Sequence, residues 1–100
     1  MKHALANAAE IPPGTARAYQ IDGTDVLICN VDGTFFAMED VCTHDGGQLD
    51  QGTLEGRCIV CPRHGAMFDV ETGAALTLPA VMPIQTFGVA LENGRVVVDL

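Results

Sequence analysis

The chain has 100 residues, of which 48% are hydrophobic, and 13 acidic residues against five lysines and arginines give it a net charge of −8. This length suits one domain, 1–100, whose core needs no disulfide bonds. Five basic residues neutralise too few phosphates for nucleic-acid binding. No segment approaches the ~20 apolar residues that cross a bilayer, and residues 1–14 lack the apolar stretch of a signal peptide. We therefore expect a cytoplasmic protein that binds neither membranes nor nucleic acid.

Short β-rich segments separated by turn residues follow one another along the chain. "TARAYQI" precedes Asp22-Gly23, "DVLICNV" and "TFFAM" flank Asp32-Gly33, and "FGVALE" and "RVVVDL" flank Asn93-Gly94. Asp-Gly and Asn-Gly are strong hairpin signals, because both central residues of a type I′ turn need positive φ. Residues 72–83 carry two prolines and are expected to form an extended loop. The pattern predicts an antiparallel, all-β domain.

Two Cys/His pairs lie between the predicted strands. Cys42 and His44 belong to "CTHDGG", and Cys61 and His64 belong to "CPRHGA". Thiolate and imidazole are typical ligands of zinc and of iron–sulfur clusters. Clustered cysteines in a reducing compartment favour metal binding over disulfides. Neighbouring glycines let backbone N–H groups approach closely, and a proline stiffens the second loop. We therefore expect two loops to converge on one metal centre.

The pattern C-x-H, then sixteen residues, then C-x-x-H resembles the Rieske [2Fe–2S] family, in which two Cys bind one iron and two His bind the other. The similarity runs from "VCTHDGGQLD" through "CPRHGAMFDV" to "FGVALENGRVVV". It implies a single Rieske domain, an antiparallel β-sandwich with a small cluster-binding subdomain formed by two loops at about residues 40–70. It also implies one [2Fe–2S] cluster per chain, with a buried iron on Cys42 and Cys61 and an outer iron on His44 and His64.

The sequence also departs from parts of that family. Respiratory and photosynthetic members have a disulfide that joins the two ligand loops, and Gly47 and Arg63 occupy those positions here. Hydroxyl groups that donate near the cluster in those members are replaced by Ala66 and Phe68. Fewer hydrogen bonds to sulfur lower the reduction potential, so we expect a value of about −150 mV.

Once His44 and His64 are assigned, only one histidine remains, which is too few for the mononuclear iron of a Rieske oxygenase. The chain is therefore expected to carry electrons and not to be an enzyme.

The resemblance implies the ferredoxin component of a bacterial aromatic-ring-hydroxylating dioxygenase system. Such a protein carries one electron from a flavin-dependent ferredoxin reductase to a terminal Rieske oxygenase. The imidazole edges of His44 and His64 are the expected electron exit, with Arg63 and residues 65–67 around the docking surface. Seven acids against two arginines in residues 39–71 predict basic partner surfaces.

Two alternatives remain open at the level of sequence. One is the small subunit of an assimilatory nitrite reductase, which has a Rieske-like fold. The other is a structural zinc module that acts through protein contacts, since Cys58-x-x-Cys61 is a zinc-like spacing. The sequence favours Cys58 as a packed residue of the strand "RCIVC" and Cys29 as a core residue. His3, near the terminus, is expected to be solvated.

Overall fold

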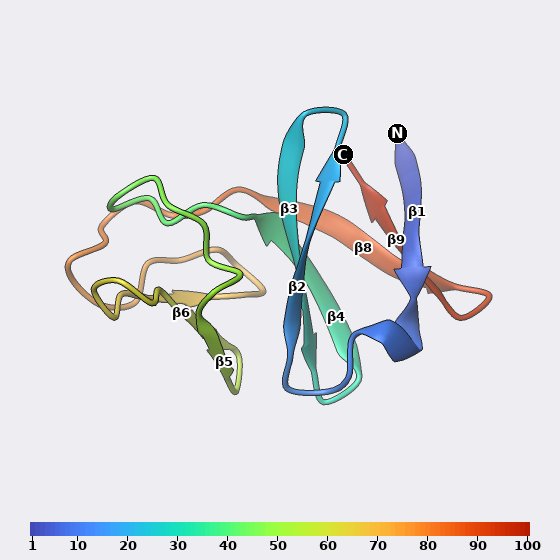
Figure 1. Cartoon of the computed structure of the whole chain (residues 1–100), viewed down its shortest axis with the longest axis horizontal. Helices are drawn as coiled ribbons and strands as arrows, with labels where there is room; N and C mark the ends of the chain where they lie inside the picture. Colours follow the sequence, from blue (N-terminus) through green and yellow to red (C-terminus); the bar gives the residue numbers. More distant parts are fainter.

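A computed structural model describes all 100 residues and is built almost entirely of antiparallel strands (Figure 1). The elements, in chain order, are β1 (Lys2–Asn7), a 3₁₀ turn (Ala8–Glu10), β2 (Ala16–Ile21), β3 (Thr24–Val31), β4 (Thr34–Glu39), β5 (Thr53–Glu55), β6 (Cys58–Val60), β7 (Met67–Asp69), β8 (Thr86–Glu92) and β9 (Arg95–Asp99). Six strands form one sheet in the order β1-β9-β8-β4-β3-β2, and three form a second sheet, β5-β6-β7. The predicted all-β class is therefore confirmed. No helix in the structure is long and apolar enough to cross a membrane.

The three predicted tight turns join β2 to β3, β3 to β4 and β8 to β9. Asp22, Asp32 and Asn93 have φ values of 50°, 51° and 54°, and the glycine after each also has positive φ. Asp and Asn tolerate this region better than other side chains, and glycine enters it without steric cost. The turns fix the registers of the three hairpins, as the sequence predicts.

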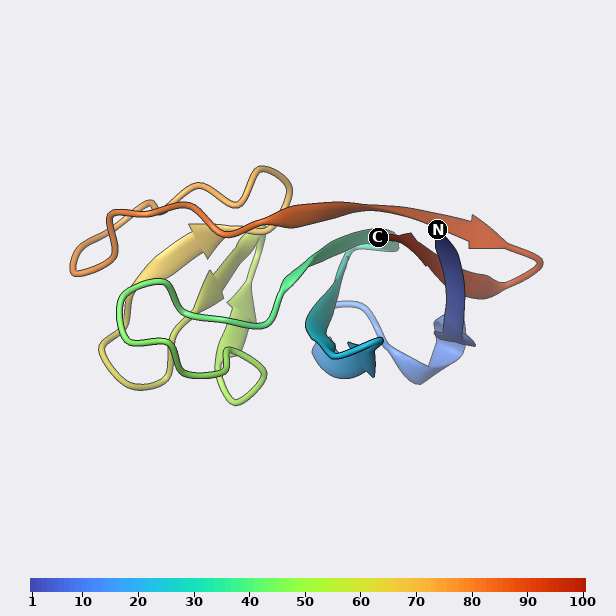
Figure 2. The same ribbon diagram turned by 90° about the horizontal axis from the view of Figure 1, so that it is seen from above.

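The six-stranded sheet curls until its two halves face each other. β4 and β8 pair at only two positions, so the sheet bends between them and brings the β2-β3-β4 half over the β8-β9-β1 half (Figure 2). Side chains from β2, β3 and β4 meet those of β9 and of Ile11, which follows the 3₁₀ turn, in one core cluster: Ile11, Ile21, Val26, Ile28, Ala37, Val96 and Val98. This sandwich is the expected Rieske-like architecture, and it forms the part of the molecule away from the Cys/His loops (Figure 1).

β3 is buried on both faces and belongs to two cores. Val26 and Ile28 point into the curled sheet, while Leu27 and Cys29 point to the opposite side. All four are fully buried, which accounts for the uninterrupted apolar run in this strand. The outer face of β3 packs against the second sheet, and this contact joins the two parts of the fold.

Residues 72–83 form an extended segment between β7 and β8, as predicted, and touch the small sheet through one bridge between Phe68 and Ala75. The base of the segment is closed where the N–H of Ile84 donates to the carbonyl of Gly73 at 2.8 Å. Two residues before Ile84, the carbonyl of Met82 accepts a hydrogen bond from Thr43 Oγ1 at 2.6 Å. The segment is thereby tied to the loop that carries Cys42 and His44.

The N-terminal strand corrects one expectation. His3 lies in β1, which pairs with β9, and its side chain is only 21% exposed. Its Nε2 lies 3.7 Å from a carboxylate oxygen of Asp22 in the β2–β3 turn. The prediction of a solvated His3 was wrong, because pairing between the first and last strands brings the chain start into the sandwich.

Candidate metal centre

Two loops of similar construction lie at one end of the molecule. In residues 42–48, the N–H of Cys42 donates to the Gly47 carbonyl at 2.7 Å, and the N–H of Gly46 returns a bond to the Cys42 carbonyl at 2.7 Å. In residues 61–66, the N–H of Cys61 donates to the Ala66 carbonyl at 2.8 Å, and the N–H of Gly65 donates to the Cys61 carbonyl at 3.0 Å. Each loop thus closes on its own cysteine. β4 leads toward the first loop, and β6 and β7 flank the second.

The two cysteines of these loops meet inside the protein. Cys42 is fully buried and Cys61 is 1% exposed, and both belong to the core cluster between β3, β4 and the small sheet. The thiol sulfurs and a carboxylate oxygen of Asp45 all lie within 4.8 Å of one another. The structure thus brings Cys42 and Cys61 together, as the sequence predicts.

The two histidines meet at the surface. His44 and His64 are exposed, and their ring centres lie 5.0 Å apart with the rings nearly perpendicular. Both pairs therefore point the same way, with thiols inside and imidazoles outside. The site therefore has a buried end that contains the two thiol sulfurs and a solvent-exposed end that contains the imidazole nitrogens.

Asp45 is a site residue that the sequence did not single out. Its carboxylate accepts hydrogen bonds from Nε of Arg63 at 2.6 Å and from the N–H of Gly47 at 2.9 Å. The guanidinium and this N–H hold the pKa of Asp45 well below its usual range. His64 Nδ1 also lies 3.5 Å from the carboxylate. The only sequence signal was its place between a histidine and two glycines.

The environment of Cys42 combines burial with backbone donors. Burial raises the pKa of the Cys42 thiol, while hydrogen bonds from the backbone N–H groups of His44 and Asp45 act in the opposite direction. These donors are suited to a sulfur that carries negative charge. A metal bound here would displace the proton, as coordination of a thiol requires.

The remaining cysteines lie elsewhere. Cys29 is fully buried in β3, and burial raises the pKa of its thiol to about 12, so it stays protonated. Cys58 lies in β6 opposite Asp69 and Glu55. The structure forms no disulfide and does not group Cys58 with Cys42 and Cys61. Cys29 is thus a core residue and Cys58 a strand residue, as predicted.

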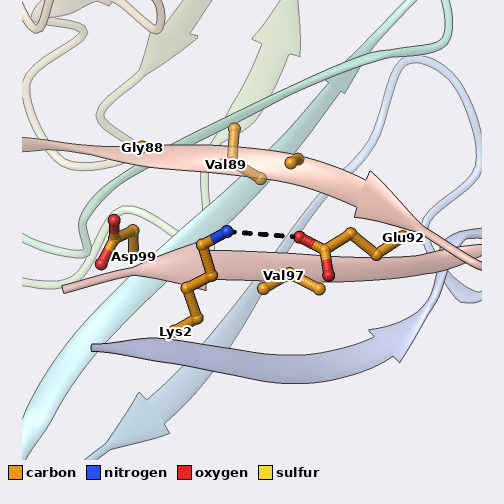
Figure 3. Close-up of a pocket in the computed structure, with 7 residues that line it drawn as sticks. Lys2, Gly88, Val89, Glu92, Val97 and Asp99 are labelled. Atoms are coloured by element: carbon orange, nitrogen blue, oxygen red, sulfur yellow. Dashed lines mark ion pairs between the residues drawn. The ribbon is translucent and has the colours of Figure 1, made fainter.

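Two shallow hollows lie on the large sheet instead. One, of about 170 Å³, is lined by Lys2, Gly88, Val89, Ala90, Glu92, Val97 and Asp99 (Figure 3). Lys2 and Glu92 form an ion pair across it at 3.6 Å. The other is lined by Gly33, Thr34, Phe35, Val89, Ala90 and Leu91. Neither hollow contains a thiol or an imidazole.

Known proteins resemble this chain in sequence over nearly its whole length. The family model described as the Rieske [2Fe–2S] domain matches residues 1–88. The ferredoxin component of biphenyl 2,3-dioxygenase from Rhodococcus jostii (strain RHA1) is 40% identical over 96 residues, which are 96% of this chain and 90% of that protein. The ferredoxin component of a naphthalene 1,2-dioxygenase system from Pseudomonas aeruginosa is 40% identical over 91% of this chain and 88% of its own length.

The fold is equally similar to solved structures. The Sphingomonas yanoikuyae B1 ferredoxin superposes with a TM-score of 0.93 at 38% identity, covering 100% of this chain and 99% of its own. The match confirms the fold class predicted from the sequence. The relatives from Rhodococcus jostii and Pseudomonas aeruginosa are named as ferredoxin components of dioxygenase systems, which confirms the predicted resemblance.

Proposed function

Since the chain belongs to the Rieske [2Fe–2S] domain family, we propose that it is the ferredoxin of an aromatic-ring-hydroxylating dioxygenase system. The [2Fe–2S] cluster of this family, when bound, accepts and releases one electron. The protein's own contribution is to hold that group, to keep one side dry and to present the other side to partners. It carries the electron and does not itself act on the aromatic substrate.

We assign Cys42, His44, Cys61 and His64 as the four ligands. The donor chemistry fits, because a Rieske cluster takes two thiolates and two imidazoles. Two thiols and two imidazoles are what the loops bring to one place. The cluster-binding unit is then residues 40–70, with the small sheet as its base. Asp45 lies beside the sulfurs, but its carboxylate is occupied by Arg63 and Gly47.

The observation that carries the proposal is the polarity of the site, with buried thiols and exposed imidazoles. Electron transfer between proteins needs a short path to the surface. Here the imidazole edges supply that path, while the sulfur end stays in the core. We infer that both the reductase and the oxygenase approach the histidine end.

Spectra of the purified protein test the proposal directly. We expect a brown protein whose reduced form gives a rhombic EPR signal with a low average g value, together with iron and sulfide in equal amounts. A colourless protein with one zinc per chain, which also fails to take up iron and sulfide anaerobically, would instead support the zinc module.

The docking surface that we propose includes an apolar segment beside the histidines. Leu78, Val81 and Met82 are 78%, 73% and 62% exposed, and Figures 1 and 2 both show residues 76–83 at the same end as the two ligand loops. Both arginines of residues 39–71 are in ion pairs, Arg63 with Asp45 and Arg57 with Asp69 and Glu71, and the surplus of acidic residues in this region remains. Transient electron-transfer contacts bury less than about 1,200 Å², so a few apolar side chains carry much of the affinity.

The variant Val81→Asp is expected to raise the KM for this ferredoxin about tenfold when a biphenyl dioxygenase oxygenase is the electron acceptor, because apolar contact is lost and a charge must be desolvated. The absorption spectrum should not change. Leu91→Asp is the control, since Leu91 is 51% exposed on β8 and is remote from the loops. Equal effects of the two variants would place docking elsewhere.

Added salt should slow turnover, as the acidic surface predicts.

The low potential expected from the sequence has a structural counterpart. Ala66 and Phe68 are fully buried beside Cys61, and neither side chain can donate a hydrogen bond. Ala66→Ser is expected to raise the midpoint potential by on the order of 50 mV, the one-electron equivalent of about 1 kcal/mol from a new donor. Protein-film voltammetry measures this. Ala80→Ser, in the same core cluster, should shift the potential much less, and equal shifts would contradict a local hydrogen bond.

A flavin-dependent ferredoxin reductase is the proposed electron source, and a terminal oxygenase the proposed acceptor. A solved carbazole 1,9a-dioxygenase complex contains a ferredoxin that superposes on this chain with a TM-score of 0.91 at 35% identity, covering 97% of this chain and 91% of that one. This complex supports a terminal oxygenase as the electron acceptor.

We place the electron transfer in the cytoplasm, where reducing conditions keep free cysteines such as Cys29 and Cys58 as thiols.

A further inference from the structure

We propose that Arg63 is a noncovalent clamp that holds the two ligand loops together and so slows release of the metal centre. The inference rests on the proposed ligands and adds a positioning residue to them. Arg63 lies on the second loop, between Cys61 and His64, and every polar partner of its side chain lies on the first loop.

The guanidinium uses three nitrogens to bridge the loops. Nε donates to Asp45 Oδ2 at 2.6 Å, and a second nitrogen donates to Asp45 Oδ1 at 3.2 Å. The third donates to the backbone carbonyl of Gln48 at 3.0 Å. A two-pronged arginine–carboxylate pair is stronger and more directional than a single contact between neutral groups. Asp45 also accepts a hydrogen bond from the N–H of Gly47 at 2.9 Å, which holds its carboxylate against its own loop.

No backbone hydrogen bond joins residues 42–48 to residues 61–65. Each loop is closed internally, and strand pairing supports only the second loop and the small sheet. The two loops are otherwise connected by buried contacts of the cysteines, by the edge contact of the imidazoles and by His64 Nδ1, which lies 3.5 Å from the Asp45 carboxylate. The hydrogen bonds of Arg63 are therefore the main directional link between the two halves of the ligand set.

The space for the clamp depends on a glycine. A Cβ on Gly47 would lie 2.5 Å from the Arg63 guanidinium carbon and 2.6 and 2.8 Å from two of its nitrogens. Contacts below 3.0 Å force something to move, and the tip of the arginine is the part that yields. Position 47 must therefore be glycine for the Arg63 guanidinium to fit in its observed position. This gives a second way to release the clamp while keeping the arginine.

The test is the rate at which iron leaves the oxidised holoprotein in the presence of excess chelator, followed by bleaching of the visible absorption. Arg63→Gln is expected to lose iron about fivefold faster than wild type, as befits one partly exposed, bidentate pair. Gly47→Ala should reproduce much of this change, and Arg63→Lys should be intermediate because it keeps the charge without the fork. Arg57→Gln is the matched control, since Arg57 pairs with Asp69 and Glu71 away from the loops.

Salt separates the clamp from a general loss of stability. In wild type and Arg57→Gln, added salt should speed iron loss by weakening the ion pair, whereas Arg63→Gln should respond little. The EPR lines of Arg63→Gln should also broaden as the imidazole positions spread. Equal iron-loss rates in Arg63→Gln, Gly47→Ala and Arg57→Gln would overturn the proposal, as would an equal salt response. A wild-type protein without the Rieske spectrum would instead reject the proposed function.

Discussion

Replacing Cys61 with serine is expected to leave the purified chain with less than about a tenth of its normal bound iron, because a ligand sulfur is removed from a site with few alternatives. Cys61 is 1% exposed, and the other cysteines of its core cluster are Cys42 and Cys29, of which Cys29 stays protonated because burial raises the pKa of its thiol. The serine hydroxyl is a poor substitute, since it is rarely ionised near neutral pH. Iron and sulfide analysis, with the visible spectrum, measures the loss.

Cys58→Ser is the control for this experiment. Cys58 is three residues from Cys61 and only partly buried in β6, so the substitution tests the same chemistry in the same small sheet. We expect full iron content and an unchanged spectrum. Loss of iron from Cys58→Ser would contradict the proposed ligands, and loss of metal from both variants would support the zinc-like pair of Cys58 and Cys61.

Gly73→Ala is expected to lower the free energy of unfolding by about 3 kcal/mol, since a strained backbone and a close contact act together. Gly73 has a φ of +79°, and a Cβ there would lie 2.0 Å from the carbonyl oxygen of Ile84. That carbonyl belongs to the backbone and cannot swing aside. The change would open the base of residues 73–84, where Gly73 accepts the N–H of Ile84. Denaturant titration measures the difference.

Gly23→Ala separates the two contributions. Gly23 has a φ of +83°, but a Cβ there would meet nothing within 4 Å. Its cost should be that of the backbone conformation alone, about 1 kcal/mol. If both variants lost the same stability, the contact with Ile84 would contribute nothing. The segment 73–84 would then not depend on this closure.

The hairpins were predictable from sequence because their turns need special backbone angles. The dipeptides Asp32-Gly33 and Asn93-Gly94 identify the residues that adopt positive φ, and each turn predicts a strand on either side of it. The same reasoning identified the two ligand loops, since Cys and His are rare and their spacing is distinctive. Burial of the thiols and exposure of the imidazoles followed from the family resemblance, and the structure has this arrangement.

Other features depend on contacts between distant residues. β1 is rich in alanine and was not predicted, because its stability comes from pairing with β9 at the other end of the chain. The short strands β5 and β7 have only three residues each, and both depend on pairing with β6. Asp45 was missed for the same reason, since its role appears only when Arg63, eighteen residues away, folds against it. A sequence pattern cannot show which of several acids an arginine reaches.

Because β3 serves two cores, the metal centre and the sandwich are parts of one cooperative unit. Opening the core that contains Cys42 and Cys61 exposes Leu27 and Cys29, and pulling these residues away also disturbs Val26 and Ile28 on the other face. Opening this core to water or oxidants is then opposed by the packing of both clusters. Protection of the buried sulfurs thus depends in part on sandwich strands that lie far from the two loops.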